Sequence, residues 1–174
     1  MQALAGILAG LFITLSGSIF SGPIDGISLT PPSSLAALPG LQKVFAGSPG
    51  PVGLENGSLS SCPASPNCVV SQNADSDHAI APIPYHTSQE EAYATLLDIL
   101  SVVPRTKVVE RTDEYIRAES SSRLMGFVDD VEFYFPQDET VIHLRSASRL
   151  GESDLGVNRR RLEQIRLAAQ DLGL

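Results

Sequence analysis

The sequence predicts an α+β fold: a four-stranded antiparallel sheet with helices packed on one face, in the order α-β-β-β-β-α. Three features predict it. Apolar residues follow a helical period over residues 87–103, a period of two over residues 106–148, and a helical period again towards the C-terminus. The connections between the alternating segments are short, which favours antiparallel neighbours in the sheet.

The first helical segment, TSQEEAYATLLDILSVV, carries signals for its own start and end. Thr87 and Glu90 have the spacing of a capping box, which satisfies free N–H groups at a helix start. Ser88 and Glu91 form a second, overlapping box. Pro104 is expected to end the helix, because proline lacks the N–H group that a helix needs. The apolar stripe consists of Ala92, Leu96, Ile99 and Leu100.

Four segments alternate as half-buried strands do: TKVVERT, EYIRAESSS, FVDDVEFYF and TVIHLRSAS. In the third segment Asp130 and Glu132 share the polar face. In the fourth, His143 and Arg145 share it. If these two strands pair, acidic and basic side chains lie on the same side of the sheet, where each opposite-charge pair adds about 0.2–1 kcal/mol. The last helix is expected to bury a stripe of Leu162, Ile165, Ala169 and Leu172.

The N-terminal 22 residues predict export or membrane insertion. The first 24 residues contain no charged side chain, and the apolar run is long enough to cross a bilayer as a helix. A secretory signal peptide is the other interpretation, with small residues at Ser21 and Gly22 near a cleavage site. Residues 23–61 are expected to be a linker rich in Pro, Gly and Ser, and residues 62–174 a globular domain.

Net charge excludes one broad class of partner. The chain carries a formal charge of −8 and no tryptophan. Because nucleic-acid binding needs a basic surface, no nucleic-acid partner is expected. No phosphate loop and no G-x-G-x-x-G motif occurs, so no cofactor is expected either.

Cys62 and Cys68 are the two cysteines of the chain. In an exported protein they predict one disulfide around the loop PASPN. Free structural thiols and a redox role are the alternatives. A metal site is not expected, because two thiols are too few ligands and no other Cys or His pair has the spacing of a zinc site.

The stretch RSASRLGESDLGVNRRRLEQIR, residues 145–166, is the most distinctive polar feature. It predicts either an anion site at a helix N-terminus or a structural belt of caps and salt bridges. Asp154 favours the belt, since as a cap it would occupy the N–H groups that an anion needs. Arg149 is expected to be the arginine that stays unpaired. The candidate ligand-binding residues are Arg145, Ser146, Ser148, Arg149, Asp154, Asn158, Arg159, Asp130 and Glu132.

Catalysis finds little support in the sequence, and no catalytic residue is assigned. There is no G-x-S-x-G motif, and His143 is expected to be an ordinary strand histidine. A hydrolase that uses Asp130 or Glu132, with Arg145 and Arg149 holding an anionic substrate, is the enzymatic alternative.

Three motifs in order, CPASPNC, GFVDDVEF and RSASRLGESDLGVNRRRLEQIR, resemble the family described as domain of unknown function 1499. The resemblance spans roughly residues 62–172. One departure is Val70, which stands before Ser71 where the family usually has a first serine. The family pattern matches Cys62, Pro63, Ser65, Pro66, Asn67, Cys68, Asp129, Asp130, Glu132, Arg145, Ser146, Ser148, Arg149, Gly151, Asp154, Gly156, Asn158 and Arg159.

The resemblance implies a setting and no reaction: members resemble bacterial, algal and plastid proteins with an export or membrane segment. We therefore expect an exported or membrane-tethered accessory domain, in the periplasm or thylakoid lumen, that binds a small anionic ligand or a membrane-protein partner. A small hydrolase and a redox-responsive protein that uses Cys62 and Cys68 are the alternatives. Contact between the cysteine loop and the RSASRLG segment would favour one composite site.

Overall fold

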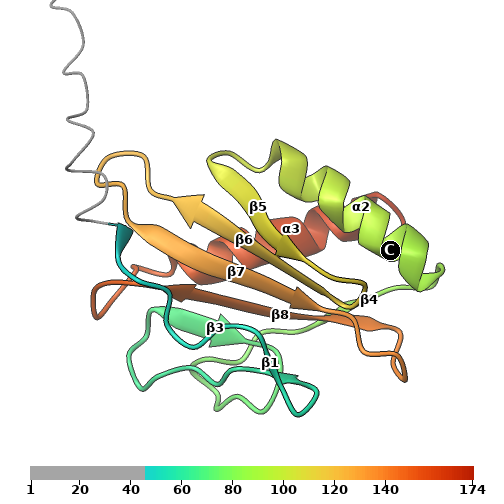
Figure 1. Ribbon diagram of the computed structural model, residues 1–174, viewed down its shortest axis with the longest axis horizontal. Helices are drawn as coiled ribbons and strands as arrows, with labels where there is room; N and C mark the ends of the chain where they lie inside the picture. The colour runs from blue at the N-terminus through green and yellow to red at the C-terminus, as the bar shows by residue number, and fades with distance from the viewer. Residues whose placement is uncertain (1–45) are drawn as a thin grey trace, which may run out of the picture. The chain divides into compact units, whose positions relative to one another are not determined.

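A computed structural model describes residues 46–174 and confirms the α+β class, with a mostly antiparallel sheet and two helices (Figure 1). The predicted signal peptide or anchor, residues 1–22, lies outside the described residues. The elements are β1 (Leu54–Glu55), β2 (Ser58–Leu59), β3 (Cys68–Val70), β4 (Ile83–Pro84), α2 (Gln89–Val102), β5 (Thr106–Arg111), β6 (Tyr115–Ser121), β7 (Val128–Tyr134), β8 (Val141–Ser148) and α3 (Val157–Asp171).

The main sheet has six strands, so the prediction of four is wrong. Strands β5 to β8 are the four predicted ones, and the order along the sheet is β3-β8-β7-β6-β5. Strand β4 also pairs with β8, through Ile83 opposite Ile142, while β3 pairs further along through Cys68 opposite Ala147. Both added strands are antiparallel to β8. They are too short to show an alternating pattern, which explains why the sequence did not predict them.

Helix α2 begins at one of the two predicted capping boxes. The Ser88 hydroxyl accepts a hydrogen bond from the Glu91 N–H at 3.2 Å, and the Glu91 carboxylate accepts the Ser88 N–H at 3.3 Å. The helix ends at Val102, with Val103 as its C-cap directly before Pro104. The start and end signals in the sequence therefore acted as predicted.

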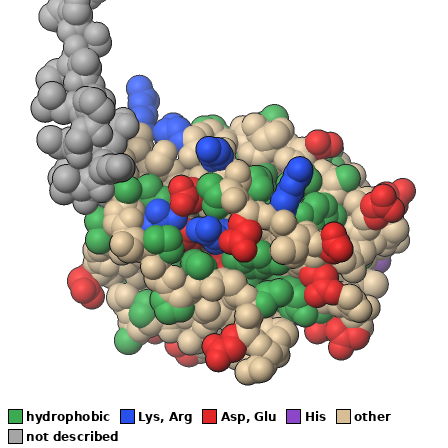
Figure 2. All heavy atoms as spheres, viewed as in Figure 1, with side chains coloured by type: hydrophobic (Ala, Val, Ile, Leu, Met, Phe, Trp, Pro, Cys, Tyr) green, Lys and Arg blue, Asp and Glu red, His purple; other side chains and the backbone are tan. Residues whose placement is uncertain are grey.

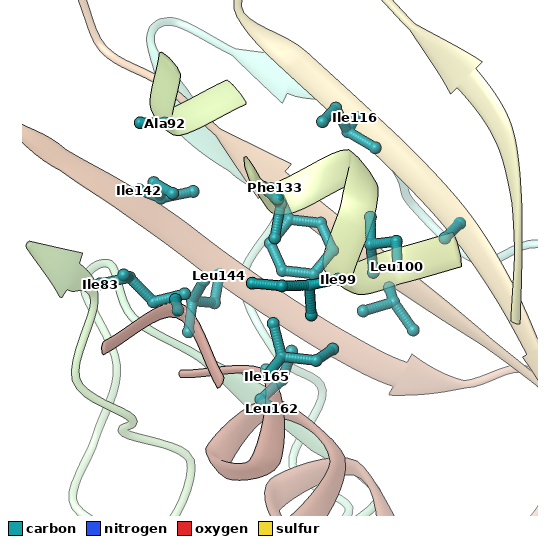
Figure 3. Packing of buried hydrophobic residues seen from close by; sticks show 14 of the residues in the cluster. Ile83, Ala92, Ile99, Leu100, Ile116, Phe133, Ile142, Leu144, Leu162 and Ile165 are labelled. Carbon is teal, nitrogen blue, oxygen red and sulfur yellow. The ribbon is translucent and has the colours of Figure 1, made fainter. Parts of the chain in front are cut away.

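One hydrophobic cluster joins buried side chains of both helices with those of the sheet (Figure 3). Ile116, Phe133 and Leu144 are neighbours across β6, β7 and β8 and all belong to it. Successive strand residues point to opposite faces, so the alternate positions of the same strands face away from this cluster. The helices contribute Ala92, Leu96, Ile99 and Leu100 from α2, and Leu162, Ile165 and Ala169 from α3. Leu172 is 63% exposed and follows the last helical residue, so its predicted place in the buried stripe is wrong.

A hairpin lies inside the segment predicted to be a linker. Strands β1 and β2 pair across Asn56 and Gly57, whose φ angles are 51° and 75°. Positive φ at both positions is what a two-residue Asn-Gly hairpin turn requires. Leu59 of this hairpin is buried in a second cluster, with Val70, Tyr115 and Tyr134. Folded structure therefore begins before Cys62, and the Asn-Gly pair between two leucines was the signal for it.

None of the helices within residues 46–174 is sufficiently long and apolar to span a bilayer.

Phe133 tests the placement of the core. Its side chain is fully buried near the C-terminal end of β7, so Phe133→Ala should lower the free energy of unfolding by about 3–5 kcal/mol in urea denaturation. The control Leu167→Ala changes a half-exposed position on α3 and should cost within about 0.5 kcal/mol. Similar losses for the two variants would contradict this core.

Candidate functional site

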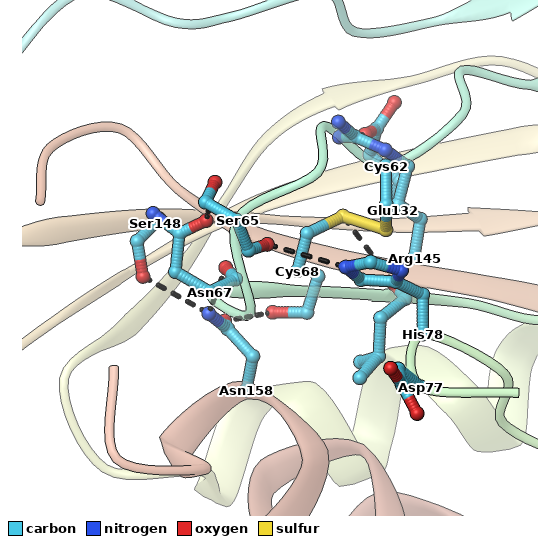
Figure 4. The surroundings of a disulfide bond; sticks show 12 residues. Cys62, Ser65, Asn67, Cys68, Asp77, His78, Glu132, Arg145, Ser148 and Asn158 are labelled. Carbon is cyan, nitrogen blue, oxygen red and sulfur yellow. Dashed lines mark hydrogen bonds and ion pairs between the residues drawn. A yellow bond between two sulfur atoms is a disulfide. The ribbon is translucent and has the colours of Figure 1, made fainter. Parts of the chain in front are cut away.

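The cysteine loop and the end of β8 lie side by side (Figure 4). Cys62 and Cys68 form a disulfide, and their Cα atoms are 5.6 Å apart. Cys68 pairs with Ala147 in the sheet, and the Asn67 side chain donates a hydrogen bond to the Gly151 carbonyl. The two sequence motifs, 84 residues apart at this last contact, thus build one composite region.

Asn158 joins the parts of this region on the helix side of the sheet. Its amide nitrogen donates to the Asn67 carbonyl at 2.9 Å and to the Ser148 hydroxyl at 3.0 Å. Its amide oxygen accepts hydrogen bonds from Ser146 and Arg161. The side chain is 1% exposed and every donor and acceptor of its amide is used, so Asn158 and Ser146 hold α3 against β8.

The N-terminus of α3 is occupied by a carboxylate of the chain itself. Asp154 accepts the N–H of Gly156 at 2.9 Å and the N–H of Asn158 at 2.6 Å. Gly156 has a φ of 76°, which glycine adopts without strain. Because Asp154 takes these donors and adds a negative charge, this helix end does not offer an anion site.

On the opposite face of the sheet, Glu132 is fully buried in a closed set of hydrogen bonds. One carboxylate oxygen accepts the Arg145 Nη1 at 2.6 Å. The other accepts the Tyr115 hydroxyl and the Gly53 N–H, each at 2.7 Å. Burial and the neighbouring carboxylate raise the pKa of Tyr115, so its hydroxyl remains a donor to Glu132.

Asp130 carries the second ionic group of this face. Arg149 donates two parallel hydrogen bonds of 2.8 Å to the Asp130 carboxylate, from Nε and Nη2. It also donates a hydrogen bond to Glu119 on β6. The hydrogen bonds to Asp130 raise the pKa of Arg149. Arg117 reaches the same carboxylate at 3.2 Å. The prediction that Arg149 stays unpaired is therefore wrong, because two acidic side chains of neighbouring strands lie within its reach.

Arg145, which is buried, is instead an arginine with unused donors among the described residues. Its side chain is 3% exposed, and among the described residues its Nη1 bonds Glu132 while its buried Nε has no hydrogen-bond partner. A buried polar group without a partner costs about 1–3 kcal/mol. Such a group calls for an explanation, because native proteins leave few of them.

A pocket of about 280 Å³ lies beside Arg145. Its walls come from three stretches of chain: the segment before β1, the start of the cysteine loop, and the ionic face of β7 and β8. It is lined by Gly50, Pro51, Val52, Ser61, Cys62, Pro63, Asp130, Arg145, Ala147, Ser148 and Arg149.

The structure thus divides the predicted site residues into two groups. Asp130, Arg145, Ser148 and Arg149 line the pocket, and Glu132 holds Arg145 from behind. The other group lies at the start of α3. There Asp154 caps the helix, and Asn158 bonds it to Ser146 and Ser148 of β8. Arg159 donates to the carbonyls of Asp77 and Ala79, which fastens α3 to the segment before β4.

Sequence reasoning missed the residues that cover the ionic face. Gly53 and Pro51 lie in the predicted linker, and no local pattern links Gly53 to Glu132, 79 residues away. Tyr115 and Arg117 were predicted to lie on a strand, yet only the register of β6 against β7 shows that they meet the buried acids.

His78 fastens the cysteine loop from the side. Its Nδ1 lies 2.8 Å from the Asp75 carboxylate, and its Nε2 lies 3.2 Å from the Ser65 carbonyl. Both ring nitrogens face acceptors, so the protonated imidazole can satisfy both. The hydrogen bond to Asp75 is the main cause that raises the pKa of His78.

Ser71 directly follows β3 and bonds β8 between the stretches of β8 that pair with β3 and with β4. Its hydroxyl accepts the Leu144 N–H at 2.9 Å and lies 3.0 Å from Nδ1 of His143. Burial lowers the pKa of His143, which favours the neutral ring. The hydroxyl therefore replaces a missing backbone partner in the sheet.

A family model described as "Protein of unknown function (DUF1499)" matches residues 58–168, which contain all three motifs and the pocket's ionic face. The chain belongs to this DUF1499 family. The match begins within the β1–β2 hairpin and ends within α3, so it covers most of the described DUF1499 domain. No curated protein matches the chain.

The Glu132–Arg145 pair can be tested by a double-mutant cycle. Arg145→Met leaves a buried carboxylate without its cation, so the free energy of unfolding should fall by about 3–5 kcal/mol. The double variant with Glu132→Gln should lose less than the sum of the two single losses, with a coupling of about 0.5–3 kcal/mol in urea denaturation. Additive losses would mean that the two side chains do not interact.

Arg166 provides the matched control for that cycle. It pairs with Glu163 at the surface of α3, where both side chains are about one-third exposed. Arg166→Met should therefore cost at most about 1 kcal/mol, as is usual for exposed ion pairs.

His78 predicts a pH dependence of stability. Since its pKa is raised from 6.5 in the folded state, its contribution is complete below that value and is lost as the pH rises through the folded pKa. The stability difference between the native chain and His78→Gln, from urea midpoints, should be larger at acidic than at basic pH. His143, whose lowered pKa acts in the opposite direction, cancels in this difference. A stability difference for His78→Gln that stays constant with pH would contradict this role of His78.

Proposed function

We propose that this chain is an accessory ligand-binding domain, exported or tethered through its apolar N-terminal segment, that recognises a small anion beside Arg145. The observation that supports it most strongly is the incompletely bonded guanidinium of Arg145 in the wall of a pocket. A carboxylate or phosphate group is the ligand chemistry that a guanidinium fork fits best.

The charges around the pocket favour an anion. Three charged residues line it, and the carboxylate of Asp130 is fully engaged by Arg149 and Arg117. Arg145 gives only one of its five N–H donors to Glu132 among the interactions of the described residues. For an anion in the pocket, donors of Arg145 are therefore available, whereas the one carboxylate among the lining residues is already paired with two arginines.

The size and walls of the pocket limit the ligand. A volume of 280 Å³ is just below the range of about 300–1,000 Å³ that is common for small-molecule sites. The rest of the wall is mostly apolar, so a short apolar body would be accommodated beside the charged group. It consists of Pro51, Val52, Cys62, Pro63 and Ala147, with Gly50, Ser61 and Ser148. A small carboxylic acid or a phosphate monoester is consistent with these limits.

Two features support an extracytoplasmic location. The Cys62–Cys68 disulfide is of the kind that persists in oxidising compartments such as the periplasm. The apolar run of residues 1–22 has the length of a membrane-crossing or signal segment. Periplasm and thylakoid lumen remain the proposed settings.

The geometry favours binding over the hydrolase alternative. Asp130 and Glu132 are 2% and 0% exposed and are bonded at both oxygens, so neither is free to act as an acid or base on a substrate. For the redox alternative, Cys62 of the disulfide lines the pocket, so reduction of the disulfide is expected to change ligand binding.

The binding proposal is tested by titrating the full chain with acetate, succinate and phosphate in a calorimeter. At least one of them should bind saturably. Arg145→Lys keeps the charge but loses the fork, so affinity should fall about tenfold or more, the equivalent of a lost charge-assisted hydrogen bond. Unfolding curves show whether this variant remains folded.

A second pair of variants tests the position of the ligand without touching the ionic face. Ser61→Trp places a large side chain in the pocket wall and should abolish binding. Ala64→Trp changes an exposed position of the same cysteine loop outside the pocket and should leave affinity unchanged. Saturable binding that survives both Arg145→Lys and Ser61→Trp would contradict the proposed site, as would no saturable binding of any of the three anions.

A further inference from the structure

One end of the sheet gathers several loops, here called the loop end: residues 102–105, 122–127 and 149–157. The loop 122–127 joins β6 to β7 and is closed by the hydrogen bond from Ser122 N–H to the Phe127 carbonyl. The β8–α3 connection begins beside it, where the Arg149 N–H donates to the Val128 carbonyl at 3.1 Å. Residues 102–105 lie at the same end, since Ser121 N–H donates to the Arg105 carbonyl.

The loop end exposes an unusual share of apolar side chains. Within residues 46–174, ten large apolar side chains are exposed, and six of them lie at this end. Leu124 and Leu155, at the tips of two loops, are 91% and 84% exposed. Single exposed apolar residues are ordinary, whereas a group of them at one end indicates a contact surface. The six are Val102, Leu124, Met125, Leu150, Leu155 and Val157.

The exposed charges at the loop end are mainly basic, on a chain of net charge −8. In these loops Arg105 and Arg123 are exposed, and Glu152 is the exposed acid. The exposed Arg160, in the first turn of α3, lies beside them and donates to the Leu155 carbonyl. In the view of Figure 2, basic side chains gather at the upper left and acidic ones crowd the right side. The loop end is thus the part of an acidic protein that suits an anionic surface.

The described chain also begins at the loop end. Gly47 packs so closely on Leu150 and Arg149 that a side chain at position 47 would collide with them. The 46 residues before it contain the apolar run of residues 1–22. If that run enters a membrane, the chain reaches the folded domain on the loop-end side.

We propose that the loop end docks on a lipid bilayer that contains anionic headgroups, with Leu124 and Leu155 entering the interface. Apolar side chains flanked by arginines bind such interfaces because burial of apolar surface and attraction to anionic lipids act together. The basic charge of the loop end favours a lipid surface over a protein partner. So does the position of Gly47, where the described chain begins, against the loop end. This surface is separate from the proposed anion pocket and goes beyond that function.

The test measures how deeply individual positions of the full chain enter lipid. Leu124→Cys, Leu155→Cys and Leu172→Cys each receive an environment-sensitive fluorophore, and the protein is reconstituted into vesicles with brominated acyl chains. Leu172 is the control, because it is 63% exposed but lies at the C-terminal end of α3, opposite to the helix end that meets the loop end. In vesicles of phosphatidylcholine and phosphatidylglycerol, quenching at positions 124 and 155 should exceed that at position 172 several-fold.

Two comparisons complete the test. Vesicles of phosphatidylcholine alone, or the exchange of Arg123 and Arg160 for glutamine, should reduce quenching at positions 124 and 155. Equal quenching at all three positions, or a chain that does not associate with the anionic vesicles, would overturn the proposal and leave the loop end as a protein-binding surface. The anion titration with Arg145→Lys is independent of this result, so the two proposals can fail separately.

Discussion

The buried ion pair between Glu132 and Arg145 is the interaction on which the non-helical face of the sheet depends. It joins β7 to β8 at directly opposed positions, and its carboxylate also binds β6 through Tyr115 and the segment before β1 through Gly53. A fully buried carboxylate is tolerated only when paired and hydrogen-bonded, so these three donors are a requirement of the fold. The carboxylate of Glu132 therefore positions both the segment before β1 and Arg145, which line the pocket.

The two faces of the sheet differ in how completely their polar side chains are hydrogen-bonded. On the helix side, the amide of Asn158 is fully used in joining α3, β8 and the cysteine loop, and Asp154 accepts two N–H groups at the start of α3. On the other side, Arg145 keeps donors that its neighbours do not use, and a pocket lies beside them. The distinctive polar stretch of residues 145–166 is therefore mostly structural, and the proposed anion contact is confined to its first residue, Arg145.

Local signals in the sequence predicted the strands β5 to β8, the start of α2 and the disulfide, because each rests on residues close together in the chain. The alternation of β7 and β8 even placed Glu132 and Arg145 on one face. It could not choose which arginine remains under-bonded, since that depends on Glu119, a residue from a third strand. The short strands β3 and β4 and the cover at Gly53 are tertiary contacts without a local pattern, so no periodicity reveals them.

The central claim is that unused donors of Arg145 receive a small anion. Side-chain NMR of the full chain with ¹⁵N-labelled arginine, titrated with the best ligand among acetate, succinate and phosphate, tests it most directly. The Arg145 signals should shift saturably, while those of Arg166, held by Glu163 at the surface, should shift only weakly and without saturation. Arg145 signals that stay unchanged, or that move no more than those of Arg166, would contradict the account.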